Sequence, residues 1–149
     1  MQRLRFVRPA IVLFLLLSPS AVPAQNSSAS LDSLEGLLEL VQASVLEIHP
    51  WGSDVARLEQ PDRLIFDLDP GDGVAWSAVL EAAFEVRTQL DYDGLASFVK
   101  TSGGKGLHIY VRIVPEWGFQ DVRRAALAFA REVERRAGGD VTTTWWRKD

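Results

Sequence analysis

The sequence contains no cysteine, which excludes disulfide bonds, thiolate metal sites and cysteine nucleophiles. It also lacks an excess of positive charge: the net charge is -4, whereas general nucleic-acid binders are usually basic. No internal repeat occurs, and a short polar stretch near the amino terminus is the one low-complexity segment. What remains is a chain of 149 residues, 47% hydrophobic and 24% charged, which is the composition of one globular domain.

The positive charges that are present are unevenly placed along the chain. They crowd into the last third, at Arg112, Arg123, Arg124, Arg131, Arg135, Arg136, Arg147 and Lys148. A local basic face can meet phosphate groups even when the total charge is negative. The other interpretation is a solvated helix face, and the sequence leaves both open.

Residues 1–25 have the pattern of a secretory signal peptide. Three arginines open the segment, and the apolar run of residues 10–17 is too short to span a bilayer as a mature helix. Residues 21–24 resemble a cleavage site, and residues 26–30 form a polar linker. The alternative is a misplaced start codon, with upstream sequence translated ahead of a domain fragment.

Residues 31–149 are predicted to form an α+β domain. Helices are expected over residues 32–43, 76–90 and 119–137, and strands over residues 45–48, 63–69, 96–101, 107–114 and 141–146. This order indicates a mixed or antiparallel sheet with helices packed on one face. The strand over residues 63–69 alternates, so that its leucines and phenylalanine face one way and its aspartates the other. The face with the carboxylates is expected to meet solvent or a ligand.

Asp67 and Asp69 are the strongest candidates for metal ligands. Residues at i and i+2 on a strand point the same way, with α-carbons ~7 Å apart. That spacing lets both carboxylates converge on a pair of divalent ions, and oxygen ligands suit Mg²⁺ or Mn²⁺. The alternative is an exposed strand end whose acids are merely solvated.

A glycine-rich segment, Ser102-Gly103-Gly104-Lys105-Gly106, is a candidate anion-binding loop. Glycines allow the backbone to approach a ligand closely, and Lys105 adds a positive charge. The segment is not a Walker A loop, because a glycine follows the lysine. His108 begins the next strand on the polar face that Tyr110 and Arg112 share. A flexible hairpin tip is the alternative, and His49, before a proline, is weak evidence alone.

Three segments taken together resemble the polymerase domain of bacterial DNA ligase D, in the archaeo-eukaryotic primase superfamily. They are residues 45–52, with the sequence VLEIHPWG, residues 61–71, with PDRLIFDLDPG, and residues 97–108, with SFVKTSGGKGLH. The resemblance covers residues 31–149. It implies a primase-polymerase-like fold and a metal-dependent DNA nucleotidyltransferase of non-homologous end-joining repair.

The resemblance also implies roles for individual residues and partners for the chain. Asp67 and Asp69 match the metal-binding pair, and His49 matches a further active-site histidine. The triphosphate-binding loop is matched by Ser102, Gly103, Gly104, Lys105, Gly106 and His108. The implied cofactor is Mn²⁺ or Mg²⁺, and the implied partners are a nucleoside triphosphate, DNA ends, a ligase module and a Ku-type end-binding protein. The family implies a cytoplasmic location without membrane attachment.

The sequence departs from that family in two respects. The family domain is about twice as long, above the usual size of a domain. Its third metal-binding acid lies on the strand after the region that Trp145 and Trp146 match, and this chain ends short of that position. We therefore expect an incomplete active site. The signal-like pattern of residues 1–25 also conflicts with this family, because a secreted polymerase would lack nucleotides and DNA. The conflict favours a truncated or mis-started chain over a secreted polymerase.

Three alternative functions remain at this stage. The first is a remnant that binds nucleotide or DNA ends without turnover. The second is a phosphatase of the haloacid dehalogenase kind with Asp67 as nucleophile, although Gly71 stands where that family has threonine or valine. The third is an exported binding domain in which the two aspartates are only solvated.

Overall fold

The computed structural model describes residues 11–15, 33–45 and 52–144 of the chain. These residues fall into two units: residues 18–51 form one, and residues 1–17 together with 52–149 form the other. The smaller unit holds helix α1 (Leu34–Gln42), which begins at Ser33, whose hydroxyl oxygen accepts a hydrogen bond from the Gly36 amide at 3.1 Å. The predicted helix is confirmed, whereas most of the strand expected over residues 45–48 lies outside the described residues.

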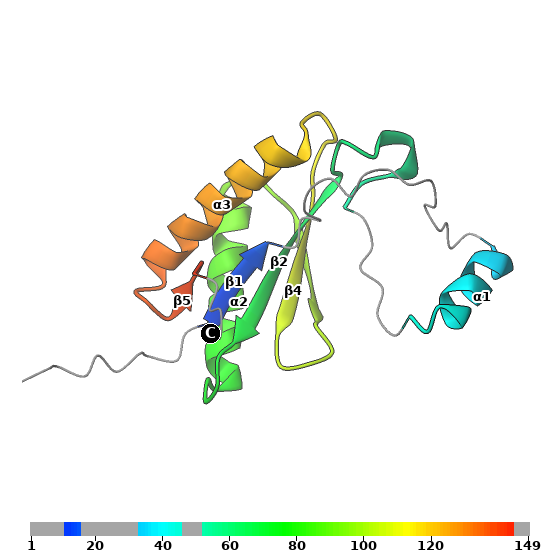
Figure 1. The fold of residues 1–149 in the computed structure, drawn as a ribbon. Coiled ribbons are helices and arrows are strands. Elements are labelled where there is room, and N and C mark those ends of the chain that lie inside the picture. Colours follow the sequence, from blue (N-terminus) through cyan, green and yellow to red (C-terminus); the bar gives the residue numbers. More distant parts are fainter. Residues whose placement is uncertain (1–10, 16–32, 46–51, 145–149) are drawn as a thin grey trace, which may run out of the picture. The chain divides into compact units, whose positions relative to one another are not determined.

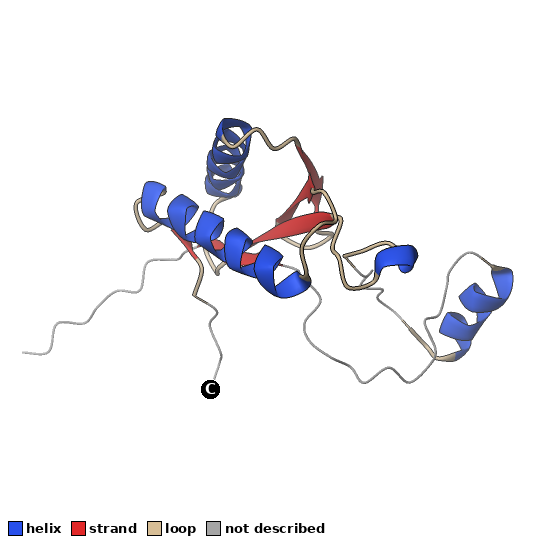
Figure 2. Ribbon diagram, turned by 90° about the horizontal axis from the view of Figure 1, so that it is seen from above, coloured by secondary structure: helices blue, strands red, loops and turns tan. Residues whose placement is uncertain are grey.

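The larger unit is a five-stranded sheet with two long helices (Figure 1). The strands lie in the order β3 (Ser97–Thr101), β4 (Leu107–Arg112), β2 (Arg63–Pro70), β1 (Ile11–Leu15) and β5 (Val141–Thr142). All neighbours are antiparallel except β1 and β5. Helices α2 (Trp76–Tyr92) and α3 (Phe119–Arg136), seen from above in Figure 2, pack on the same side of the sheet, because buried residues of both join one core with alternate residues of β2. A 3-10 turn spans Val55–Arg57. The predicted fold class is confirmed.

The core lies between the sheet and these two helices. Alternate side chains of β2 supply Leu64, Phe66 and Leu68, of which Phe66 is 1% exposed and Leu68 fully buried. Phe66 meets Phe129 of α3 with ring centroids 5.0 Å apart. The alternation leaves Asp67 and Asp69 on the opposite face, because successive side chains of a strand point to opposite sides.

Helix α2 turns a slightly different face to the core than its sequence predicts. The helical spacing predicts an inward face of Val79, Leu80, Ala83, Val86 and Leu90. In the structure Val79, Val86 and Leu90 are buried, but Ala82 is buried as well and Leu80 is 38% exposed. The helix lies near the edge of the sheet, where β3 is the last strand, so its apolar stripe is wider than the surface available to cover it. Within the described residues, no helix is long and apolar enough to cross a bilayer.

Strand β1 is the largest difference from the sequence interpretation. Residues 11–15 belong to the apolar run that the sequence pattern predicts to be part of a signal peptide, yet in the structure they form an inner strand between β2 and β5. The run has the sequence IVLFL, and branched and aromatic residues favour strands as readily as they fit the apolar part of a leader. Removal of residues 1–25 in cells stays a prediction. Removal would take β1 out of this sheet.

Candidate nucleotide and metal site

The candidate site lies on the sheet face that the helices leave uncovered, around the end of β2. Asp67 is half-buried, with 24% of its side chain exposed, and Asp69 is exposed. Burial raises the pKa of the Asp67 carboxyl, His108 opposes that change, and the charge of Asp69 adds to it. The two carboxylates therefore form a concentrated negative site that a cation would stabilise.

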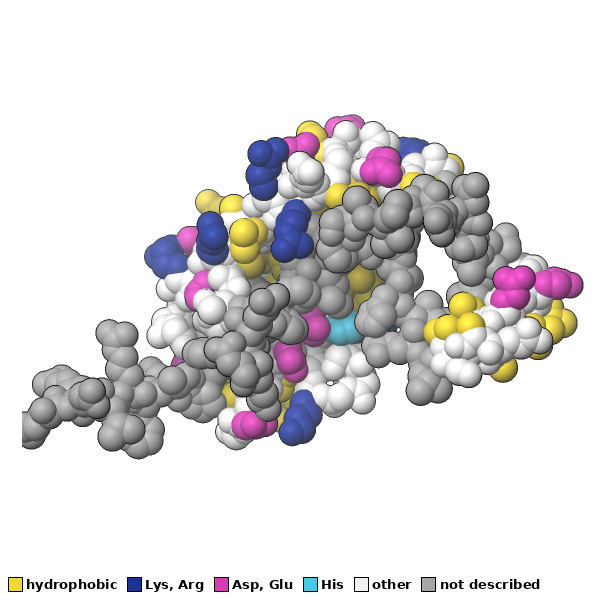
Figure 3. Space-filling view, viewed as in Figure 1, with side chains coloured by type: hydrophobic (Ala, Val, Ile, Leu, Met, Phe, Trp, Pro, Cys, Tyr) yellow, Lys and Arg dark blue, Asp and Glu magenta, His cyan; other side chains and the backbone are white. Residues whose placement is uncertain are grey.

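His108 comes from β4 and lies directly opposite Asp67 in the antiparallel register. Its Nε2 is 3.4 Å from Asp67 Oδ1, and Figure 3 shows a histidine beside acidic side chains on this face. The other ring nitrogen, Nδ1, is buried and has no hydrogen-bond partner among the described residues. If Nε2 carries the proton toward the carboxylate, Nδ1 is an unsatisfied acceptor. The predicted placement of His108 on the polar face is confirmed.

The glycine-rich segment forms a tight turn between β3 and β4. The Ser102 amide donates to the Gly106 carbonyl at 3.0 Å, and Gly103 has a φ of +91°. The Ser102 hydroxyl oxygen accepts from the amides of Gly106 at 3.2 Å and Gly104 at 3.4 Å. The serine thus holds the turn from inside. The amides of Gly103 and Lys105 make no hydrogen bond to any residue that the structure describes, so they are available to an anion.

A close backbone approach joins this turn to the strand of the two aspartates. Leu107 is paired with Leu68 across β4 and β2. A Cβ atom placed on Gly106 would lie 2.3 Å from the Leu68 carbonyl oxygen, a distance that real Cβ atoms essentially never show. Glycine is therefore required at position 106. Because it has no side chain, the turn can lie directly against the Asp67-Leu68-Asp69 segment.

The structure thus brings together Asp67, Asp69, His108 and the turn of residues 102–106, as the sequence predicts. His49 lies outside the described residues, as do Trp145, Trp146 and the last three residues. No group of three or more histidine, cysteine or acidic side chains able to hold a metal occurs among the described residues. Strand β1, which flanks β2 on the side away from β4, has the sequence IVLFL and brings no carboxylate. Two carboxylates with hard oxygen donors fit Mg²⁺ or Mn²⁺ in type, but they do not complete its coordination.

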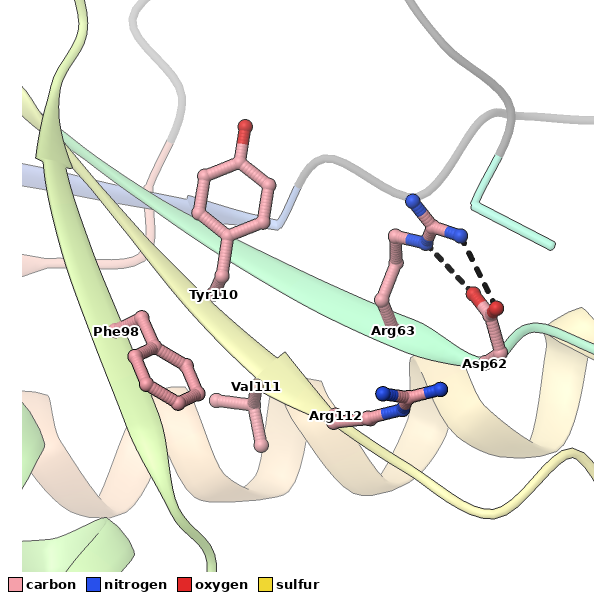
Figure 4. A pocket seen from close by; sticks show the side chains of 6 residues that line it. All are labelled: Asp62, Arg63, Phe98, Tyr110, Val111 and Arg112. Atoms are coloured by element: carbon pink, nitrogen blue, oxygen red, sulfur yellow. Dashed lines mark hydrogen bonds and ion pairs between the residues drawn. The ribbon is translucent and has the colours of Figure 1, made fainter.

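The same open face carries a second feature to which the sequence analysis gave no role. A pocket of about 300 Å³ lies along β2, β4 and β3, and its lining is Asp62, Arg63, Phe98, Tyr110, Val111 and Arg112 (Figure 4). The sequence placed Tyr110 and Arg112 on the polar face. The sequence carries no local signal for this pocket, because the opposition of Arg63, which begins β2, and Arg112 of β4 depends on strand register. Two like charges at opposed positions need compensation.

The comparisons with known proteins agree with this fold. Residues 14–149 match the family model described as the LigD primase-polymerase domain. The multifunctional non-homologous end joining protein LigD of Pseudomonas aeruginosa is 38% identical over 119 residues, which cover 80% of this chain and 14% of that protein. The corresponding LigD protein of Mycobacterium tuberculosis is 35% identical over 122 residues, covering 76% of this chain and 16% of that protein.

A solved structure shows the same fold. The polymerase domain of Mycobacterium tuberculosis ligase D, in complex with DNA, matches with a TM-score of 0.65 and 26% identity over 97% of this chain. The fold is thus that of the primase-polymerase class. The chain belongs to the LigD primase-polymerase domain family. It spans about half (52%) of the solved domain and about a seventh (14%) of the Pseudomonas relative.

Proposed function

We propose that this chain binds a nucleoside triphosphate together with Mn²⁺ or Mg²⁺, for nucleotidyl transfer to DNA ends in non-homologous end joining. The observation that carries the proposal is the approach of Gly106 to Leu68, which sets an anion-binding turn beside two carboxylates. The family relatives are named for end joining, and the solved domain was obtained with DNA. By the same relationship we propose a cytoplasmic protein that acts with a ligase module and a Ku-type end-binding protein.

The residues of the site have separate parts in this proposal. Asp67 and Asp69 would hold the cation, which supplies positive charge against the phosphate oxygens. The free amides of Gly103 and Lys105 and the Lys105 ammonium group would bind those oxygens from the other side. Ser102 shapes the turn, because its hydroxyl oxygen accepts from the Gly104 and Gly106 amides, and its O–H would remain able to donate to a phosphate oxygen. His108 keeps the half-buried Asp67 in place.

A second candidate is nucleotide binding without turnover, and one observation favours it. Only two carboxylates converge at the open end of β2 among the described residues, and no third metal-binding side chain joins them. The family match and the antiparallel neighbours on both sides of β2 give no support to the phosphatase alternative. Primer extension with a 3′-overhang duplex separates the two candidates, because the binding-only form would retain nucleotide affinity without adding a nucleotide.

The proposal predicts that Asp67→Asn/Asp69→Asn weakens nucleotide binding by at least about tenfold, because charge-assisted metal contacts are lost. The measurement is the affinity of the full chain for a labelled nucleoside triphosphate, with Mn²⁺ and with chelator. The full chain is needed because β1 lies within residues 11–15. Wild-type binding should require Mn²⁺, and the variant should bind as weakly as wild type does in chelator.

A matched control removes two carboxylates elsewhere. Asp91 and Glu116 are exposed and lie outside the site, so Asp91→Asn/Glu116→Gln should bind as wild type does. Equal weakening by both double variants would mean that net charge, not the β2 pair, sets the affinity. Metal-independent binding by the wild type would refute the assignment of Asp67 and Asp69.

A further inference from the structure

The pocket at the far end of the open face combines an aromatic ring with an excess of guanidinium groups. Tyr110 stands out from the sheet in Figure 4, whereas Val111 points to the helix side. Arg63 binds Asp62 through two hydrogen bonds, Nε to Oδ1 at 2.6 Å and Nη2 to Oδ2 at 3.0 Å. Arg112 lies opposite Arg63 and has no side-chain hydrogen bond or ion pair in the part of the chain that the structure describes.

The charge balance of this pocket favours an anion. The hydrogen bond from Arg63 lowers the pKa of the Asp62 carboxyl, and the charge of Arg112 lowers it further, so Asp62 is ionised. Asp62 is paired with Arg63, on which Asp54 also acts, so among the described residues Arg112 keeps a positive charge that no carboxylate pairs with. Lys100 adds another, with its Nζ 5.3 Å from the centre of the Tyr110 ring. A planar guanidinium group is well suited to a phosphate, which it can bind with two parallel hydrogen bonds.

The aromatic surface favours a base next to that phosphate. Along β4 the open-face residues are His108, Tyr110 and Arg112 in that order, so Lys100, paired with His108, approaches Tyr110 from one side. The pocket that Arg63 and Arg112 line lies on the other side. Phe98, 71% exposed on the edge strand β3, adds apolar surface to the lining. A flat aromatic ring followed by a guanidinium group is the arrangement on which single-stranded nucleic acids stack.

We infer that this pocket binds one nucleotide of a single-stranded nucleic acid, with the base against Tyr110 and the phosphate on Arg112. The inference rests on the proposed function in one respect, namely that the nucleic-acid strand runs from this pocket toward the carboxylates of β2. From Arg112 to His108 is four residues along β4, or ~13 Å at the usual rise of a strand. That is the span of a few nucleotides, so a strand held here would lead to the carboxylates of β2. The pocket is thus a holding site for an overhanging end.

The test measures binding of the full chain to a labelled oligothymidine by fluorescence anisotropy in chelator. Tyr110→Leu should weaken binding by roughly 5-fold to 100-fold, the range seen for loss of one base-stacking contact. Tyr110→Phe should retain it. The chain has two tyrosines, and Tyr92 is 81% exposed on α2, so Tyr92→Leu is the matched control and should bind as wild type does.

Arg112 is tested by the salt dependence of the same binding. Loss of one phosphate contact should reduce the slope of log K against log salt by about 0.7 in Arg112→Gln. Arg87, on α2, is an exposed arginine outside the pocket, and Arg87→Gln should leave the slope unchanged. An abasic strand should respond to Arg112→Gln and be indifferent to Tyr110→Leu. An oligouridine arm tells whether the strand is held as DNA or as RNA.

Photocrosslinking gives a second measurement that does not depend on affinity. Ultraviolet light should attach oligothymidine to the tryptic peptide of residues 106–112, which contains Tyr110. Attachment only to other peptides, or equal binding by wild type, Tyr110→Leu and Arg112→Gln, would overturn the inference. All variants are compared after their thermal unfolding has been shown to match the wild type.

The two proposals fail separately. Asp67→Asn/Asp69→Asn should keep its oligothymidine affinity in chelator while losing metal-dependent nucleotide binding. A wild type that shows no metal-dependent nucleotide binding, but holds oligothymidine through Tyr110 and Arg112, would refute the proposed function and leave the pocket as a nucleic-acid site. Metal-dependent nucleotide binding with no oligothymidine affinity would refute the pocket alone.

Discussion

Val12→Pro is expected to lower the free energy of unfolding of the full chain by about 2–4 kcal/mol, through a lost ladder hydrogen bond and the clash of the ring. Val12 is paired with Asp69 of β2 on one side and with Thr142 of β5 on the other. Its amide therefore meets a neighbouring strand whichever way it points. The measurement is urea-induced unfolding followed by circular dichroism. Domains are stable by only 5–15 kcal/mol, so a shift of this size is easily measured.

The control is a proline placed in the same terminal region but outside β1. Ala21→Pro falls beyond Leu15, where the strand ends, and should leave the unfolding midpoint unchanged. An unchanged midpoint in Val12→Pro would mean that residues 11–15 are not part of the sheet. The intact mass of the purified chain must be measured as well, because a processed chain would lack position 12.

The outcome bears on the leader-like pattern of residues 1–25. A chain cleaved after Ala24 and a chain folded with β1 in the sheet are two different molecules, because the cleaved form has lost an inner strand. It would expose the edge of β2 that carries Asp67 and Asp69, with unpaired backbone groups along its length. Export with cleavage and the sheet described above are therefore alternatives for any one copy of the chain.

The parts of the fold that the sequence predicts are those with local signals. The alternation of β2 predicts the faces of Leu64, Phe66 and Leu68 correctly. The helical spacing of α3 predicts an inward face of Phe119, Val122, Ala126, Phe129 and Val133, of which Val122, Ala126 and Val133 are buried. Strand β1 could not be predicted in this way. Its partner β2 lies some fifty residues further on, and a short apolar run looks the same in a leader as in a buried strand.

The candidate site likewise has features that local sequence patterns predict and features that they do not. The sequence placed Asp67, Asp69 and His108 on one face, because alternation along two strands is a local pattern. It could not show that the Ser102 hydroxyl binds the amides of its own turn, nor that Arg63 and Arg112 would meet across β2 and β4. Both depend on strand register, which is set by packing between distant segments.

Gly106→Ala is expected to have the largest effect of any single substitution in the site. The added Cβ would lie 2.3 Å from the Leu68 carbonyl oxygen and 3.3 Å from the Leu68 carbonyl carbon. These are backbone atoms of an inner strand, so they cannot move aside as a flexible side chain could. Overpacking of this kind costs typically 1–3 kcal/mol and occasionally more, and we expect about 3 kcal/mol here.

Gly106→Ala should also weaken metal-dependent nucleotide binding. Relief of the clash must move the turn away from β2, which separates the amides of Gly103 and Lys105 from Asp67 and Asp69. Metal-dependent nucleotide binding should therefore be lost even at temperatures where Gly106→Ala remains folded. Calorimetric unfolding and the nucleotide-binding assay, performed on the same preparation, measure the two effects separately.

The neighbouring glycines supply a graded control for this prediction. A Cβ on Gly104 would come no closer than 3.9 Å to the Ser102 hydroxyl, so Gly104→Ala should be tolerated in both assays. Gly103 has open space around it but a φ of +91°, so alanine there should cost about 1–2 kcal/mol through backbone strain alone. If Gly104→Ala proved as damaging as Gly106→Ala, flexibility of the turn would matter more than its contact with β2. If the loss of binding is instead largest for Gly106→Ala, smaller for Gly103→Ala and smallest for Gly104→Ala, nucleotide binding depends on the contact between the turn and the strand of the two aspartates.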